Sequence, residues 1–171
     1  GNGRTGKYFA YQHTSIVPDV MTTAKGLGNG FPIGAVMTQG KAVGLLGAGS
    51  HGSTYSGTVL GSRVVYTVLD TLEKENAVAN AATVGAYIVD QLKAQLAGYN
   101  VQVRGFGMMI GIQLPKDCAE LVAIARDQYK LIINVTAGSV VRLLPPLNMT
   151  HAQVDELLQR LVPALQNFLK A

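Results

Sequence analysis

The apolar positions of the chain follow one pattern up to about residue 57 and another beyond it. Residues 1–57 hold 13 of the 20 glycines, and Gly and Pro interrupt their short apolar stretches. This pattern predicts strands and loops rather than helix. The predicted strands cover residues 19–24 and 33–38, and the segment between them, 25–32, is too rich in glycine to form helix interior.

Beyond residue 57 the spacing of apolar residues predicts helices alternating with strands. Apolar residues recur every three or four positions over 59–75, which indicates an amphipathic helix, and a second helix is predicted over 77–96 with Gly98 marking its end. Strands at 101–104, 108–114, 131–135 and 140–144 and a helix at 119–129 follow. The last helix starts after the N-cap Thr150 and places leucines on one stripe, namely Leu157, Leu158, Leu161, Leu165 and Leu169.

These elements predict an α/β protein in two parts. Residues 1–76 are expected to belong to a larger domain built on an α/β layer, whose sheet is expected to be parallel. Residues 98–171 are expected to form a small α+β domain, and the helix at 77–97 is expected to connect the two parts.

Composition narrows the class of protein. Charged residues make up 14% of the 171 positions, against about 25% in ordinary domains, and hydrophobic residues make up 48%. Intrinsic disorder is excluded, and the low charge predicts that something outside these residues covers part of the apolar surface. The net charge is +4, but the basic residues never form a run of three, so nucleic-acid binding is not expected.

Cysteine and histidine usage excludes several kinds of site. The single Cys118 rules out an intramolecular disulfide framework and fits a reducing compartment, so the cytoplasm is the expected location. The three histidines show no ligand spacing, so no metal site is expected. No apolar run approaches the ~20 residues of a membrane span. The chain starts at Gly1 in the middle of a motif, which leads us to expect a truncated sequence.

Gly1, Gly6 and Lys7 have the spacing of a nucleotide-binding phosphate loop. However, Tyr8 stands where that loop needs a Ser or Thr hydroxyl to reach magnesium, and no strand pattern precedes Gly1. A site for a nucleoside triphosphate is therefore not expected.

A second glycine pattern, Gly105, Gly107 and Gly111, imitates a dinucleotide fingerprint. That motif requires a helix to begin at the glycines, whereas residues 108–114 continue as a strand-like run. Close backbone packing or a bulge between two strands is the favoured interpretation, and an NAD-linked enzyme is the disfavoured one.

Lys25 is the first candidate for chemistry, because it directly follows a predicted strand and is surrounded by small residues. A lysine in that position is poorly placed to reach water. An unprotonated amine attacks carbonyls, which makes Lys25 a candidate for a Schiff base with an aldehyde cofactor. Taken by itself, a lysine at this position is more often a surface residue beside a turn, and a wider context is needed to favour the chemical role.

Three ordered motifs place Lys25 in a wider context. They are residues 3–13 continued by 18–19 and 23–35, residues 51–55, and residues 140–147. Together they resemble the cofactor lysine region, the phosphate-contacting turn and the arginine strand of the class III aminotransferases, which use pyridoxal 5'-phosphate. The resemblance implies a fold-type I enzyme of which this chain is the C-terminal part, comprising the end of the large-domain sheet and the small domain.

The resemblance also implies a role for individual residues. Lys25 would form the internal aldimine and carry the proton between the substrate carbon and the cofactor. Thr54 would contact the cofactor phosphate, typically that of the other subunit in a homodimer with a shared active site, and Ser53 would contact substrate or phosphate. Arg142 would face a substrate carboxylate, for which a planar guanidinium fork is the natural partner.

Each of these assignments has a structural alternative. Thr54 and Ser53 could cap the helix that starts at Val59. Arg142, between Val and Leu in a predicted strand, could be a charge that protects an exposed sheet edge.

Within the family the pattern is most similar to the acetylornithine aminotransferases. This likeness implies exchange of the ω-amino group of N-acetylornithine with 2-oxoglutarate, in arginine biosynthesis. Enzymes acting on ornithine, succinylornithine or 4-aminobutyrate share every motif present here, so the amino donor stays open.

Two departures from the family pattern limit what the chain is expected to do. The family usually continues from its phosphate turn with two glycines, asparagine and proline, whereas this chain has residues 56–59 in the order Ser, Gly, Thr, Val. The aspartate that holds the cofactor's pyridine nitrogen would precede Gly1, in the missing N-terminal half. The 171 residues alone are therefore expected to be inactive, and a non-catalytic, dimerising remnant is the alternative.

Overall fold

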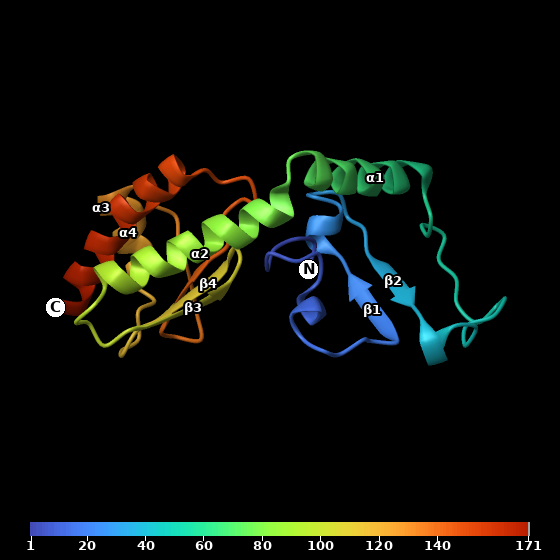
Figure 1. Cartoon of the computed structure of the whole chain (residues 1–171), viewed down its shortest axis with the longest axis horizontal. Coiled ribbons are helices and arrows are strands. Elements are labelled where there is room, and N and C mark those ends of the chain that lie inside the picture. The colour runs from blue at the N-terminus through green and yellow to red at the C-terminus, as the bar shows by residue number, and fades with distance from the viewer. Residues whose placement is uncertain (171) are drawn as a thin grey trace.

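The computed structural model describes residues 1–170, which form the ordered series of helices and strands shown in Figure 1. The helices are α1 (Val59–Lys74), α2 (Ala77–Gln95), α3 (Leu121–Tyr129) and α4 (His151–Lys170). The strands are β1 (Val20–Thr23), β2 (Ala35–Thr38), β3 (Gln102–Phe106), β4 (Met109–Gln113), β5 (Asn134–Thr136) and β6 (Val140–Leu143). Short 3-10 turns cover Ala10–His13, Lys25–Leu27 and Gly40–Ala42. Every predicted helix and strand is present.

The element ends differ from the predictions most clearly after α3. A strand was expected from residue 131, but β5 starts only at Asn134. The reason is the helix end, where Lys130 takes a left-handed conformation with φ of 53° and the Leu131 amide donates back to the Ala125 carbonyl. This closure of the helix directs residues 131–133 away from the sheet.

The first sheet has two strands, and their direction corrects the expectation of a parallel sheet. β1 and β2 pair antiparallel, with Val20 opposite Thr38 and Thr23 opposite Ala35. Parallel strands need a long crossover, whereas these strands are joined by the short, glycine-rich segment 24–34. α1 lies above this pair in Figure 1.

The second sheet is antiparallel and forms the main core together with three helices. Its strand order is β3-β4-β6-β5, so β4 and β6 are internal. α2 packs along β3, and α4 packs against both α2 and α3. The buried side chains come from the inward stripes of all these elements, and they include Ala81, Val84, Ile88, Leu92, Ile110, Ile112, Val141, Val154, Leu161 and Leu165.

The start of α4 confirms the predicted cap. The Gln153 amide donates to the Thr150 hydroxyl over 3.3 Å, and the Gln153 side-chain oxygen accepts from the Thr150 amide over 2.9 Å. This reciprocal pair is a capping box. Of the predicted stripe, Leu158, Leu161 and Leu165 are buried, and the two outer leucines are half-buried.

The apolar surface is distributed unevenly along the described residues. Thirteen of the seventeen exposed large apolar side chains lie before residue 77, whereas only Leu27 and Ala42 are buried there among apolar residues. The low charge predicted uncovered apolar surface, and residues 1–76 carry most of it. No helix within residues 1–170 is long and apolar enough to cross a bilayer.

Close backbone packing around Gly107 confirms the favoured interpretation of the second glycine pattern. Gly107 has a φ of 53° and occupies the turn between β3 and β4, so no helix begins there. A Cβ on Gly85 of α2 would overlap the Gly107 carbonyl, and one on Gly6 would lie 2.8 Å from the Ala82 Cβ. The hairpin turn, α2 and the N-terminal residues therefore meet backbone to backbone, and the dinucleotide interpretation is wrong.

This packing predicts the effect of one added methyl group. Gly85→Ala should destabilise the chain by about 1–3 kcal/mol, although alanine is ordinarily about 1 kcal/mol better than glycine within a helix. Gly52→Ala is the control, since no atom lies within 4 Å of its added Cβ. Urea unfolding followed by circular dichroism measures both. Equal or greater stability of Gly85→Ala would contradict the close approach.

Candidate active site

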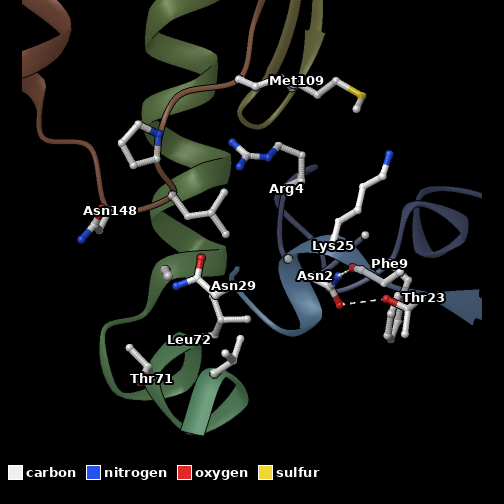
Figure 2. A pocket seen from close by; sticks show the side chains of 18 of the residues that line it. Asn2, Arg4, Phe9, Thr23, Lys25, Asn29, Thr71, Leu72, Met109 and Asn148 are labelled. Carbon is white, nitrogen blue, oxygen red and sulfur yellow. Dashed lines mark hydrogen bonds between the residues drawn. The ribbon is translucent and has the colours of Figure 1, made fainter. Parts of the chain in front are cut away.

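A cleft of about 1080 Å³ opens between the N-terminal residues, the end of β1, the side of α1 and the loop that follows β6 (Figure 2). Its wall brings Lys25 and Arg142 together, although 116 residues separate them in the sequence. Ser53 and Thr54 do not line it. The structure thus places two of the four predicted site residues around one hollow.

Lys25 is held at the cleft by an unusual backbone conformation. It follows β1 after one residue, starts the 3-10 turn Lys25–Leu27 and has a φ of 53°. Left-handed geometry costs a residue with a Cβ roughly 1–2 kcal/mol and clusters at functional sites. The side chain is exposed, and Figure 2 shows it extending from the turn toward the side of the cleft formed by Met109.

The exposure of Lys25 corrects one expectation. The amine was expected to be poorly placed to reach water, but within residues 1–170 it reaches the open cleft. The physical reason is that β1 ends at Thr23 and Lys25 belongs to the 3-10 turn on the cleft wall, so no paired strand covers its side chain.

Arg142 lies on β6, whose position in the sheet excludes one of its two interpretations. β6 pairs with β4 on one side and β5 on the other, and Arg142 is opposite Gly111 and Asn134. The edge-strand interpretation is therefore wrong, because this strand is internal. Its exposed guanidinium is left facing the cleft that also holds Lys25.

Arg4 is a cleft residue that the sequence reasoning did not single out. It is half-buried, its guanidinium donates to the Pro145 carbonyl, and one of its nitrogens lies 3.5 Å from the Met108 carbonyl oxygen. Burial lowers the pKa of the Arg4 guanidinium from its ordinary value, yet an arginine stays charged at neutral pH. The sequence offered one indication of Arg4, namely its position between Gly3 and Gly6. A charged side chain at that position has to enter a crowded turn.

Ser53 and Thr54 lie in the exposed segment between β2 and α1. The Ser53 hydroxyl accepts from the Tyr55 amide over 3.3 Å, and Thr54 makes no side-chain hydrogen bond within residues 1–170. Neither residue caps α1, because the Thr58 hydroxyl accepts from the Gly61 amide instead, so the capping interpretation is wrong. Their contact with a phosphate or a substrate stays a prediction.

The charge of the cleft is set by Lys25, Arg4 and Arg142, with Glu75 the carboxylate on the wall among the described residues. This arrangement suits a ligand that carries negative charge and a carbonyl group. Within residues 1–170 no cluster of three or more histidine, cysteine or acidic side chains has the arrangement of a metal site.

Comparison with known proteins identifies the family. The family model described as aminotransferase class III matches residues 1–165. The chain belongs to the class III aminotransferases. The acetylornithine aminotransferase of Nitrosomonas europaea is 43% identical over all of this chain, which corresponds to 44% of that protein. The chain thus spans less than half the length of the curated relatives that it matches.

Solved structures of the family show the same fold. The ornithine δ-aminotransferase of Plasmodium falciparum matches 99% of this chain and 46% of its own with a TM-score of 0.90 and 32% identity. The ornithine aminotransferase of Toxoplasma gondii matches all of this chain and 42% of its own, with a TM-score of 0.91 and 28% identity. That structure is described as having pyridoxal phosphate at partial occupancy in its active site.

The hydroxyl that caps α1 belongs to Thr58 and not to Thr54, so substituting each residue separately tests the structural role of Thr58. Thr58→Ala should weaken α1 by about 1 kcal/mol and speed exchange of its first-turn amides roughly fivefold, because the Gly61 amide loses its acceptor. Thr54→Ala is the matched control and should leave that exchange unchanged. Hydrogen-exchange mass spectrometry of the 171-residue chain measures both, and equal effects of the two variants would contradict this assignment.

Proposed function

We propose that this chain is the C-terminal part of a pyridoxal-phosphate-dependent aminotransferase that transfers the ω-amino group of N-acetylornithine to 2-oxoglutarate, in arginine biosynthesis. The observation that carries the proposal is the shared cleft of Lys25 and Arg142. The acetylornithine aminotransferases among the relatives support this amino donor, and the ornithine aminotransferases among the solved structures make ornithine the second candidate. A cytoplasmic homodimer with a shared active site belongs to the same proposal.

The cleft fits one end of the cofactor and one end of the substrates. Lys25 supplies an exposed amine for the cofactor aldehyde, and Arg142 supplies a guanidinium for a carboxylate. Glu75 is the carboxylate on the wall among the described residues, and the aspartate for the pyridine nitrogen is expected before Gly1. The residues present therefore fit the group in part, and the remainder of a full-length enzyme would complete the site.

The residues of this chain have separate tasks in the proposed reaction. Arg142 binds and orients the carboxylate of the oxo acid through two parallel hydrogen bonds. Lys25 would hold the cofactor at its Nζ atom and, once the substrate amine has taken its place, would hold at that atom the proton removed from the substrate carbon that bears the amine. Pyridoxal phosphate, when bound, supplies an electron-accepting ring that stabilises the carbanion left by this proton transfer.

Borohydride reduction of the complete enzyme, meaning this chain joined to the part that its longer relatives possess, tests the proposal. After incubation with pyridoxal phosphate and reduction, peptide mapping should find the cofactor mass on Lys25, because its amine is the one in the cleft. Lys25→Ala should abolish this label and the amino transfer, whereas Lys7→Ala, outside the cleft, should leave the label in place.

The same labelling, repeated on the 171-residue chain alone, tests the alternative of a non-catalytic remnant. That alternative rests on the exposed apolar surface of residues 1–76, which a dimer interface would cover. It predicts neither a labelled Lys25 nor amino transfer in the purified protein. Amino transfer by this chain alone would contradict the remnant, and a label on a lysine other than Lys25 would contradict the proposed role of Lys25.

A further inference from the structure

The backbone that carries Lys25 is held from one side by Asn2. The Asn2 side-chain nitrogen donates to the Ala24 carbonyl over 3.0 Å, and its side-chain oxygen accepts from the Thr23 hydroxyl over 3.1 Å (Figure 2). Both ends of one amide are therefore used on the two residues that directly precede Lys25. Asn2 has a φ of 55°, a conformation that asparagine tolerates better than most residues.

The Ala24 carbonyl is the point on which the direction of Lys25 depends. It accepts from the side-chain amide of Asn2. It also accepts from the backbone amide of Leu27 over 3.1 Å, and this second bond closes the 3-10 turn. Lys25 lies inside this turn in its left-handed conformation. Because the conformation is costly, it needs surrounding contacts that fix the peptide on each side, and Asn2 supplies them on the N-terminal side.

The other side of the N-terminal turn is fixed to the sheet that carries Arg142. The Met108 amide donates to the Arg4 carbonyl over 2.9 Å, and the Arg4 guanidinium bonds the Pro145 carbonyl. Met108 directly precedes β4 and Pro145 follows β6 by two residues, so both mark the same end of this antiparallel pair. Arg142 lies one residue from that end of β6.

Residues 1–6 are themselves pressed against the hairpin. A Cβ on Gly107 would lie 2.5 Å from the Thr5 carbonyl carbon, so the two backbones are in contact without a side chain between them. The turn thus has little freedom to shift relative to β4 and β6. A displacement of Lys25 relative to Arg142 would require the loss of a contact at Asn2 or at Arg4.

We propose that residues 1–6 form a brace in which Asn2 is a positioning residue for Lys25 and Arg4 anchors the same turn to the sheet of Arg142. The brace rests on the proposed function, because it assigns to Asn2 the orientation of the amine that reacts. The side-chain hydrogen bonds of Asn2 are to Thr23 and Ala24 and not to Lys25 or Arg142, so its removal should slow the step that uses Lys25 and leave binding at Arg142 intact.

Asn2→Asp in the complete enzyme tests the brace, because it keeps the shape and the tolerance of positive φ but loses the donor to Ala24. It should lower kcat by about 10- to 100-fold, as expected for a misplaced catalytic group, and change the KM for 2-oxoglutarate by no more than about twofold. Asn2→Gly adds no charge and accommodates positive φ. It should likewise lower kcat and change the KM for 2-oxoglutarate by no more than about twofold.

Asn29→Asp is the matched control. Asn29 also lines the cleft, has a φ of 45° and makes no side-chain hydrogen bond within residues 1–170, so this variant adds the same charge without breaking a contact. Hydrogen exchange supplies a readout independent of activity. The Leu27 amide should exchange at least about tenfold faster in both Asn2 variants and at the wild-type rate in Asn29→Asp.

The exchange experiment keeps the brace and the proposed function separable. If the wild-type enzyme carries no cofactor on Lys25, the proposed function fails, and exchange at Leu27 still shows whether Asn2 holds the turn. If Lys25 is labelled but Asn2→Asp matches Asn29→Asp in kcat and in exchange, the brace is overturned and the function stands.

Discussion

The N-terminal turn lies against α2 and the β3–β4 hairpin because Gly6, Gly85 and Gly107 leave no side chains between their backbones. This contact sets the distance between the two walls of the cleft. Lys25 belongs to the wall built on β1, and Arg142 belongs to the wall built on β6. A single methyl group at the junction would separate elements whose alignment the cleft requires, since close-packed backbones cannot absorb it.

The two walls differ in what stabilises them. The sheet β3-β4-β6-β5 and the helices α2, α3 and α4 enclose a continuous apolar core, whereas residues 1–76 bury only Leu27 and Ala42 among their apolar residues. The low share of charged residues does not separate the two parts, since residues 1–76 hold 10 of the 24 charged positions; what distinguishes this N-terminal part is its exposed apolar surface. In the proposed enzyme its exposed apolar side chains meet the remainder of the large domain and a second subunit, which would make the cleft one side of a composite site.

Regular spacing made most of the fold predictable. The periodic apolar residues of α1, α2 and α4 and the Thr150 cap could be found in the sequence, because each depends on neighbours only three or four residues apart. The antiparallel direction of β1 and β2 follows from the short connection between them, which the expectation of a parallel sheet left out of account. The left-handed conformation of Lys25 could not be predicted, because the residue type does not specify it.

The site was predictable only where a motif pointed to it. Lys25 stood out beside its predicted strand and took its role from the resemblance, from which Arg142 also came. The resemblance also suggested Ser53 and Thr54, which lie outside this cleft and whose predicted contacts, for Thr54 with the other subunit's cofactor, stay predictions. Asn2 and Arg4 were missed because their partners are 21 to 141 positions distant, a separation that carries no local pattern. Thr58 was missed as a cap because hydroxyls at Ser53 and Thr54 also precede α1, and residue type alone does not show which of them accepts from the first turn.

The central claim is that Lys25 and Arg142 act in one shared site, and protection of the Lys25 amine tests it most directly. The cofactor-free complete enzyme is acetylated with and without glutarate, an unreactive dicarboxylate, and the rate at Lys25 is read by peptide mass spectrometry. Glutarate should slow acetylation of Lys25 in the wild type and in Arg104→Ala, whose residue lies on β3 outside the cleft. Arg142→Ala should lose this protection. Undiminished protection of Lys25 in Arg142→Ala would contradict the account.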